Sequence, residues 1–433
     1  MSGLPPVVEL AEWSEKVLAG HQLGPADRRL VESERRAGRV LFEELRGGLR
    51  VQARSWVGVI RLSAVEVRIV PKLAGGEASL VKMVDLLRGL ETLARHPGGA
   101  TLERAGDGLL DLFITLLCDA SDRVVRDGIV ADYVERDEEL RVVRGRLLVD
   151  RQVRERFGRV DRLLCRHDER LTDIIENQLL ATALELGARR ARGPTLRDRA
   201  RRLADAFAEV CEPAALDLDA ARRGVVYHRQ NAHYRRAHGL ALLVLDEAGI
   251  DSLHKPGPVE SFAFLLDMNR LFEELLTKVV QVALADTTAR VQAQRRDGSV
   301  LWDATRGRSY ARVIPDLLVS WEDVDAKVPI DAKYKLYDED NADPADLYQA
   351  FLYASAYGDG RTAANARALL VYPSAQPTIG VDRLQVRRSA QAVGELAIVG
   401  IPLAGVVDEL CERGGARPLC RELGAIVVGG PAL

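Results

Sequence analysis

The sequence predicts a multidomain α/β protein with a small β-rich N-terminal domain, a mainly helical middle domain and a C-terminal α/β domain. Residues 49–73 alternate apolar and polar positions, as half-buried antiparallel strands do. From about residue 79 to residue 250, apolar residues recur at spacings of three and four, which is typical of amphipathic helices. After residue 256 the pattern indicates a helix, two strands, a second helix and a third strand.

The domain boundaries follow from chain length and from glycine and proline. A chain of 433 residues is too long for one ordinary domain. Gly75-Gly76 marks a first boundary, and the segment 254–258, with two prolines and a glycine, marks a second because these residues interrupt helices and strands. The expected domains span residues 1–76, 77–255 and 256–433.

The composition is that of a soluble globular protein, with 47% hydrophobic and 29% charged residues. No apolar stretch approaches the roughly 18 residues that cross a bilayer, and the first residues lack the pattern of a secretory signal. Five scattered cysteines without a C-x-x-C pair predict a reducing cytoplasm and argue against a zinc or iron–sulfur site.

The net charge of −3 implies that any affinity for nucleic acid comes from local patches or from a partner. Two arginine-rich stretches, residues 141–166 and 189–202, are candidate patches. Solvated helix faces are the alternative interpretation, because this chain uses arginine for most of its positive charge.

Two isolated acids lie in two apolar runs on either side of a charged turn. Asp316 follows Pro315, and the second acid stands in the order Asp331-Ala332-Lys333. Only eight of the 61 basic residues are lysines, so a surface cation tolerated at position 333 would more often have been arginine. The lysine therefore indicates a specific role.

A hairpin would bring these charged groups together. If residues 312–320 pair with residues 328–335, Asp316 faces Asp331, with Cβ atoms about 5 Å apart. Lys333 then lies on the same face of the sheet, because side chains alternate along a strand. Ion pairs on the surface of a strand are the alternative explanation for the same residues.

The predicted cluster has the chemistry of a magnesium site. Mg²⁺ is usually held by one or two carboxylates together with water and substrate phosphate. Asp316, Asp331 and the backbone carbonyl of Ala332 are the candidate ligands, and Mn²⁺ is a possible substitute. The metal would polarise a scissile phosphate and help to generate hydroxide, while Lys333 would orient that water or neutralise charge on the phosphorane.

This arrangement resembles the PD-(D/E)xK metal-dependent nucleases. The resemblance implies that a glutamate from the first core helix lies near the metal, which favours Glu273 over Glu274 on the helix expected at 262–284. In the RecB-like branch a Q-x-x-x-Y pair lies beside the metal, and Gln349 and Tyr353 match this pair. A core tyrosine, a solvated glutamine and ordinary surface glutamates are the alternatives.

An ordered set of segments also resembles the McrC family, the nuclease subunit of the McrBC-type modified-cytosine-specific (type IV) restriction system. The segments are WVGVIRLSAVEVRIVPKL, RVVRGRLL, FAFLLDMNRLFEELL, IPDLLV, PIDAKYK, DLYQAFLYA and LLVYP, in this order. The resemblance implies a Mg²⁺-dependent endonuclease that cuts double-stranded DNA. It also implies an McrB-like hexameric AAA+ GTPase as partner, engaged and stimulated by residues 1–76 and part of the helical region.

Two other functions stay open. The chain has no G-x-x-x-x-G-K-[ST] motif, so we expect it to bind no nucleotide by itself. It could be a stand-alone RecB-like nuclease, or a catalytically inactive adaptor that only activates an AAA+ ring. Retention of Asp316, Asp331, Lys333 and Gln349 together argues against the adaptor. The histidines at positions 167, 228, 233 and 238 form no zinc pattern. We expect Tyr227, His228, His233 and Tyr234 in helix packing or on the surface.

Overall fold

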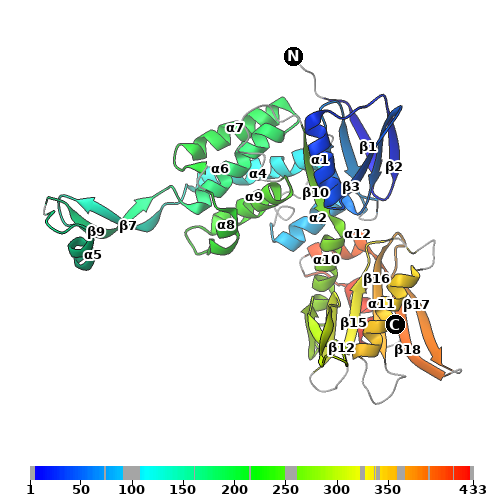
Figure 1. The fold of residues 1–433 in the computed structure, drawn as a ribbon. Coiled ribbons are helices and arrows are strands. Elements are labelled where there is room, and N and C mark those ends of the chain that lie inside the picture. The colour runs from blue at the N-terminus through cyan, green and yellow to red at the C-terminus, as the bar shows by residue number, and fades with distance from the viewer. Residues whose placement is uncertain are drawn as a thin grey trace. The chain divides into compact units, whose positions relative to one another are not determined.

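The chain is a mixed α/β protein, and its computed structural model divides into two compact units that are described separately (Figure 1). The helical unit comprises residues 1–4 and 90–259, and the sheet unit comprises residues 5–89 and 260–433. The structure describes residues 5–72, 75–90, 108–159, 161–213, 216–248, 261–321, 327–335, 337, 342–357, 366–388, 391–412 and 414–429. The boundary expected at 254–258 lies outside these residues.

Helices form the body of the helical unit, as the spacing of its apolar residues predicts. They are α4 (Leu109–Asp127), α6 (Ile175–Arg190), α7 (Pro194–Ala208), α8 (Leu218–Gly224), the 3-10 turn η4 (Ala232–Tyr234) and α9 (Arg235–Ala248). Leu109, Phe113 and Leu117 are buried on α4, four residues apart along one face. Pro194 starts α7, because proline has no N–H group to leave unbonded in a first turn. Among the described residues of either unit, no helix combines the length and apolar character needed to cross a membrane.

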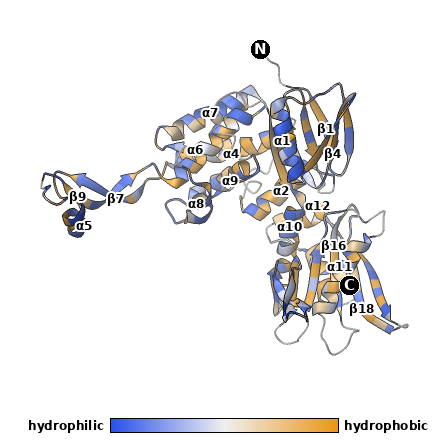
Figure 2. Cartoon of the chain, viewed as in Figure 1, coloured by the Kyte–Doolittle hydropathy of each residue, from blue (hydrophilic) through white to orange (hydrophobic). Residues whose placement is uncertain are grey.

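An arm extends from this helical body (Figure 1). It consists of β7 (Asp132–Leu140), β8 (Arg146–Leu147), α5 (Val149–Glu155) and β9 (Leu163–Leu171). β7 and β9 pair antiparallel, from Asp132 opposite Leu171 to Leu140 opposite Leu163. The arm is mostly hydrophilic (Figure 2), and most of the arginine-rich stretch 141–166 lies at its far end.

The first part of the sheet unit is rich in strands. Its elements are β1 (Val7–Ala11), β2 (Glu15–Ala19), α1 (Pro25–Arg36), β3 (Val40–Leu45), β4 (Gly48–Ala53), β5 (Trp56–Arg61), β6 (Glu66–Val70) and α2 (Glu77–Arg88). They form a three-stranded sheet in the order β2-β4-β3 and part of a second sheet in the order β1-β6-β5-β10. On β4, Leu49, Val51 and Ala53 are buried while Gln52 is exposed, which is the alternation predicted from the sequence.

The last strand of the second sheet follows the helical unit along the chain. β10 (Phe262–Asp267) pairs antiparallel with β5, with Leu265 opposite Gly58. A Cβ atom at Gly58 would lie 2.0 Å from the carbonyl oxygen of Phe264, so only glycine permits this pairing. The helix expected over 262–284 is therefore wrong in its first six residues, which form this strand. An apolar run as short as FAFLLD fits a buried strand as well as a helix.

The helix that follows, α10 (Met268–Ala283), begins where Asp267 accepts hydrogen bonds from the backbone N–H groups of Asn269 and Arg270. Residues 5–89 and 260–433 thus share one compact unit, whereas the sequence-based division separates them at residues 76 and 255. Helix α2 also lies in this unit, where Lys82 pairs with Asp408 of α12 (Leu403–Cys411) at 2.7 Å.

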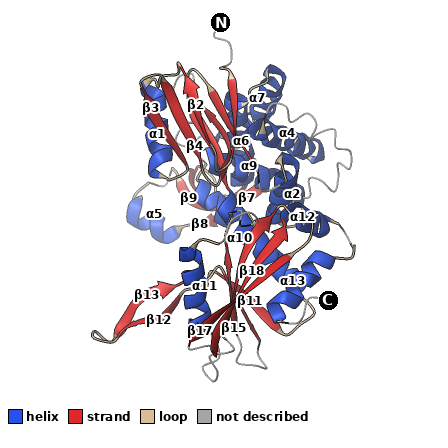
Figure 3. Cartoon of the chain, turned by 90° about the vertical axis from the view of Figure 1, so that its right-hand side faces the viewer, coloured by secondary structure: helices blue, strands red, loops and turns tan. Residues whose placement is uncertain are grey.

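A six-stranded sheet forms the remainder of the sheet unit, in the order β11-β14-β15-β16-β18-β17. Its strands are β11 (Ala289–Ala293), β14 (Leu317–Trp321), β15 (Lys327–Ala332), β16 (Arg367–Ser374), β17 (Gly380–Arg388) and β18 (Gln391–Pro402). β15, β16 and β18 run parallel, and the other pairs are antiparallel. Helices α11 (Pro344–Tyr357) and α13 (Pro418–Val428) lie on opposite sides of the sheet (Figure 3).

The predicted order of helix, strand, strand, helix, strand is present as α10, β14, β15, α11 and β16. Three strands that the sequence did not suggest intervene after α10. One is β11, and the other two are β12 (Asp297–Asp303) and β13 (Arg308–Val313), which pair only with each other.

Candidate active site

The two predicted acids meet where β14 and β15 pair. Leu317 faces Ile330 and Leu318 faces Pro329, so the expected hairpin register is confirmed. Asp316 immediately precedes β14, and its Oδ2 accepts a hydrogen bond of 2.8 Å from the backbone N–H of Ala332. This bond fixes Asp316 beside the end of β15, next to Asp331.

Asp331 lies on the face of the sheet that α11 covers. It stands in register with Leu370 of β16, and Leu370 packs with Ala350 and Ala354 of α11. Residues in register share a sheet face, and this face carries the rest of the cluster. The Asp331 residue is only 2% exposed, so its charge is largely removed from water.

Lys333 reaches back to this acid. Its backbone N–H donates to the carbonyl of Val371 at 2.8 Å, which holds the chain against β16 beyond the end of β15. Its Nζ lies 2.9 Å from Oδ2 of Asp331 and donates to Oε1 of Gln349 at 3.1 Å. The lysine is therefore held between an acid of the sheet and an amide of α11.

Gln349 and Tyr353, one helical turn apart on α11, continue this chain of contacts. The Nε2 of Gln349 donates to the Tyr353 hydroxyl at 2.8 Å, and that hydroxyl donates to the carbonyl of Ile314 at 3.1 Å. Tyr353 thereby orients the Gln349 amide so that its oxygen faces Lys333. The structure brings the predicted Q-x-x-x-Y pair to the predicted lysine.

Glu273 comes to the same region from α10. Its Oε2 accepts a hydrogen bond of 3.2 Å from Nε2 of Gln294, and the backbone N–H of Gln294 donates to the carbonyl of Asp316 at 2.8 Å. Glu274 instead pairs with Arg270 at 3.0 Å and with Arg88 at 2.9 Å. Of the two glutamates considered, Glu273 is the one in contact with the site.

Two residues of the cluster escaped sequence reasoning. Asp346 on α11 lies 3.8 Å from Nζ of Lys333, and it binds Nζ of Lys335 at 2.8 Å and the hydroxyl of Tyr337. Its position three residues before Gln349 puts it on the same helix face, a signal that could have found it. Gln294 directly follows β11, and the sequence around it did not predict that strand or its position beside the site.

The electrostatics of the cluster reflect an excess of buried negative charge. Burial, followed by repulsion from Asp331, raises the pKa of Asp316 to about 7. Burial also raises the pKa of Asp331, although Lys333 opposes the shift, and burial raises the pKa of Glu273. Burial alone would lower the pKa of Lys333, but Asp331, Asp346 and Asp316 outweigh it and raise that pKa.

The residues fit a divalent cation by their donor chemistry. Among the described residues, no group of three or more His, Cys, Asp or Glu side chains is arranged to hold a metal ion. Mg²⁺, however, is commonly bound through one or two carboxylates plus water. Asp316 and Asp331 supply two, and their raised pKa values indicate negative charge that a cation would offset.

The comparisons with known proteins agree with the ordered sequence segments. The family described as McrBC 5-methylcytosine restriction system component matches residues 51–373, about three quarters of the chain. The chain belongs to this family. No curated protein matches it.

Two solved structures are similar to this chain to different degrees, and the first has a similar fold. One is a refined half-complex from a tetradecameric assembly of Thermococcus gammatolerans McrB AAA+ hexamers with bound McrC; a chain of it matches with a TM-score of 0.61 and 18% identity, over 97% of this chain and 100% of that one. The Thermococcus gammatolerans McrBC complex matches with a TM-score of 0.44 and 21% identity, over 64% of this chain and 88% of that one.

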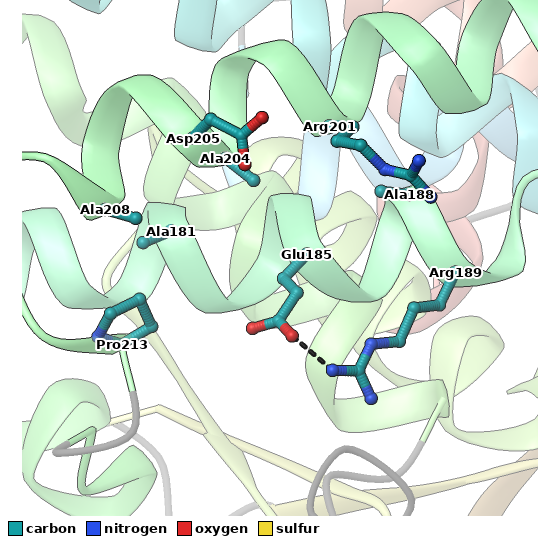
Figure 4. Close-up of a pocket in the computed structure, with 9 residues that line it drawn as sticks. All are labelled: Ala181, Glu185, Ala188, Arg189, Arg201, Ala204, Asp205, Ala208 and Pro213. Carbon is teal, nitrogen blue, oxygen red and sulfur yellow. Dashed lines mark hydrogen bonds and ion pairs between the residues drawn. The ribbon is translucent and has the colours of Figure 1, made fainter. Parts of the chain in front are cut away.

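The helical unit also contains a shallow pocket of about 260 Å³ (Figure 4). Its lining comes largely from α6 and α7 and includes an ion pair between Glu185 and Arg189. None of the predicted site residues lines this pocket, and its remaining walls are mostly alanine. Arg201 and Asp205 are its other charged lining residues.

Proposed function

We propose that the six-stranded sheet and its helices form a PD-(D/E)xK nuclease core, and that the chain is the DNA endonuclease subunit of an McrBC-type restriction complex. The observation that carries the proposal is the Lys333 ammonium, held at 2.9 Å from Asp331 and bonded to Gln349. Asp316 stands beside this pair at the end of the adjacent strand. Membership of the McrBC family supports the same interpretation.

Asp316 and Asp331 would hold Mg²⁺, or Mn²⁺ as a substitute, with Glu273 and the carbonyl of Ala332 as further candidate ligands. When bound, the metal would polarise the scissile phosphate and lower the pKa of a water. The protein would position the metal through carboxylates that are largely removed from water.

Lys333 would stabilise charge that develops on the phosphate. Its raised pKa keeps the ammonium protonated at neutral pH, which favours this role over abstraction of a proton. Gln349 would aim the ammonium, and Tyr353 would aim Gln349 through the contacts at 3.1 and 2.8 Å. These two residues act through the lysine and are therefore positioning residues.

We also propose an McrB-like AAA+ GTPase as the partner and modified double-stranded DNA as the substrate. The half-complex of similar fold contains McrB AAA+ hexamers with bound McrC. Residues 1–76 and part of the helical unit would make the contact. The arm exposes Val142, Val143 and Phe157, apolar side chains that a partner surface would cover. The free cysteines fit a reducing cytoplasm as the place of action.

The experiment combines the full chain with an McrB-like AAA+ protein from the same organism, methylated or unmethylated plasmid, Mg²⁺, and GTP or ATP. We expect cleavage of methylated plasmid with GTP only when both proteins are present. Asp331→Ala and Lys333→Ala should abolish cleavage and leave GTP hydrolysis by the complex intact. Lys327→Ala, on the same strand as Asp331, and Asp382→Ala, exposed on β17, are the matched controls.

Three outcomes would contradict the proposal in different ways. Cleavage by the Asp331→Ala variant would show that Asp331 is not part of the active site. Efficient cleavage by this chain alone, without nucleotide, indicates a stand-alone RecB-like nuclease. Stimulated nucleotide hydrolysis without any cleavage under all conditions indicates an inactive adaptor of the AAA+ ring.

A further inference from the structure

The β12–β13 ribbon, residues 297–313, projects from the sheet unit beside α11 (Figure 3). It pairs with neither large sheet, and an isolated two-stranded ribbon has little stability of its own. Its base is held instead by side-chain packing. Val300 and Leu301 pack against a cluster that includes Leu318, Tyr353 and Tyr357. The ribbon is thus anchored on the core and free to present its outer part.

Both ends of the ribbon are tied to the candidate active site. At its start, Gln294 bonds to the carbonyl of Asp316 and to the carboxylate of Glu273, three residues before β12 begins. At its end, Ile314 accepts the hydrogen bond from Tyr353 directly after β13. A substrate bound at the acids would therefore lie next to the base of the ribbon.

The ribbon region is basic within an acidic chain. The ribbon together with the three residues before it, 294–313, contains five arginines and two aspartates, a net charge of +3, whereas the whole chain has −3. Among the described residues, no carboxylate lies within ion-pair distance of Arg296, Arg308 or Arg312. In the arm, by contrast, Arg156 and Arg166 pair with Glu139 and Asp137 at 2.6 and 2.7 Å. Arg296, Arg308 and Arg312 are therefore available to a ligand, whereas these two arginines of the arm are neutralised locally.

Two large aromatic residues accompany these cations. Trp302 is 59% exposed and Tyr310 is 76% exposed. Exposed aromatic rings among basic side chains suit contacts with duplex DNA, where apolar groups contact base edges in a groove and cations bind phosphates. A two-stranded ribbon also has the dimensions to enter the major groove of B-form DNA.

We propose that the β12–β13 ribbon is a DNA-binding wing that contacts the duplex flanking the scissile phosphate. Arg296, Arg308 and Arg312 bind backbone phosphates, and Trp302 and Tyr310 contact the groove. The proposal rests on the proposed function of the site, because that function supplies the DNA. It differs from the two arginine-rich stretches 141–166 and 189–202, which lie in the other unit.

The test measures binding of a fluorescent methylated duplex to the full chain with its AAA+ partner, in Ca²⁺ to prevent cleavage. The combined variant Arg296→Ala, Arg308→Ala and Arg312→Ala should weaken binding at least about tenfold. The slope of the logarithm of the binding constant against the logarithm of the salt concentration should become less steep by about 2 to 3, because three phosphate contacts are lost. Trp302→Ala with Tyr310→Ala should weaken binding about tenfold with the salt dependence unchanged. A combined Lys278→Ala, Arg387→Ala and Arg421→Ala variant removes equal charge at exposed positions of the same unit and should change little. A photo-crosslinking residue at position 310 should capture the duplex.

Binding by the wing variants that equals the binding of the charge-matched control would overturn the proposal, as would wild-type protein that does not bind the duplex. Variants that bind DNA normally but no longer co-elute with the AAA+ partner would show a protein contact instead, which also overturns it. The binding assay needs no chemistry. If the wild-type complex never cuts DNA but the wing variants lose binding, only the proposed nuclease function is contradicted. If the wild-type complex cuts DNA but the wing variants bind it normally, only the proposed wing is contradicted.

Discussion

Two buried polar clusters, one in each unit, differ in how their groups satisfy one another. In the helical unit, the Tyr234 hydroxyl donates to Oδ1 of Asn177 at 2.8 Å and accepts from the backbone N–H of Val130 at 2.9 Å. His238 has the carbonyl of Glu176 at 3.0 Å from Nε2 and the Tyr227 hydroxyl at 3.0 Å from Nδ1. A carbonyl can only accept, so Nε2 carries the proton and Nδ1 accepts from the tyrosine.

The cluster of the sheet unit is unbalanced by comparison. Lys333 pairs with Asp331, and Asp346 is shared between Lys333 and Lys335. The pKa values of Asp316, Asp331 and Glu273 are nevertheless all raised, with burial as the main cause. A neutral network in which donors match acceptors stabilises a fold, whereas buried charge without sufficient compensation costs stability. The first cluster therefore serves the fold, and the raised pKa values of the second support the proposal that it binds a cation.

The largest expected effect separates the two clusters by function. Asp331→Asn should lower the DNA cleavage rate of the complex by at least about 10²-fold, because it removes a carboxylate proposed to bind the metal. The free energy of unfolding should stay equal or rise, since a buried charge is lost. Cleavage assays and denaturant unfolding of the same preparation check both, with Asp382→Asn as control. A marked loss of stability would show that Asp331 has a structural role, and the two clusters would then not differ as described.

The helical cluster should respond in the opposite way. Asn177→Ala removes an amide that donates to the carbonyls of Val130 and Thr172 and accepts from Tyr234. The free energy of unfolding should fall by about 2 to 3 kcal/mol, because buried partners lose their hydrogen bonds. Cleavage by the folded protein should not change. Denaturant unfolding measures the loss, exposed Gln230→Ala serves as control, and unchanged stability would contradict the structural role.

The pH dependence of stability should also have opposite signs. The folded-state pKa of Asp316 is raised to about 7, so the folded state binds its proton more tightly than the unfolded chain does. Wild-type stability relative to Asp316→Asn should therefore be highest below pH 4 and fall as the pH rises towards 7. Thermal melting in metal-free buffer at several pH values follows this difference.

Burial lowers the pKa of His238 to about 4, so the unfolded state binds its proton first on acidification. Wild-type stability relative to His238→Gln should fall as the pH drops from about 6.5 towards 4. Melting curves of the wild type, Asp316→Asn and His238→Gln over one pH series measure both differences. Parallel trends in the two pairs would show that the clusters do not differ as described.

The smallest effect is expected at the edge of the candidate site. Tyr353→Phe removes the hydroxyl that accepts from Gln349 and donates to Ile314. Cleavage should fall by about tenfold and stability by about 1 kcal/mol, because Lys333 keeps its acid but loses the aimed amide. Steady-state cleavage at several pH values measures this, and Tyr348→Phe, exposed on the same helix, is the control. A complete loss of cleavage would make Tyr353 more than a positioning residue.

Local pattern was sufficient to predict one part of the site. The hairpin register followed from two apolar runs around a turn, and the spacing of Gln349 and Tyr353 placed both on one helix face. The strand at 262–267 could not be predicted, because its partner β5 lies about 200 residues earlier and its apolar run fits helix and strand alike. The buried bond of 3.0 Å from the Tyr334 hydroxyl to Glu12 was hidden for the same reason. Contacts between distant segments depend on tertiary packing that no local pattern encodes.

The most direct test of the central claim is Mn²⁺ binding to the full chain, measured by electron paramagnetic resonance at neutral pH. The unbalanced charge around Asp331 predicts that wild-type protein binds Mn²⁺ and that Mg²⁺ competes for the same site. Asp331→Asn should weaken binding at least about tenfold, and His238→Gln should leave it unchanged. Equal Mn²⁺ affinity in wild type and Asp331→Asn would contradict the account.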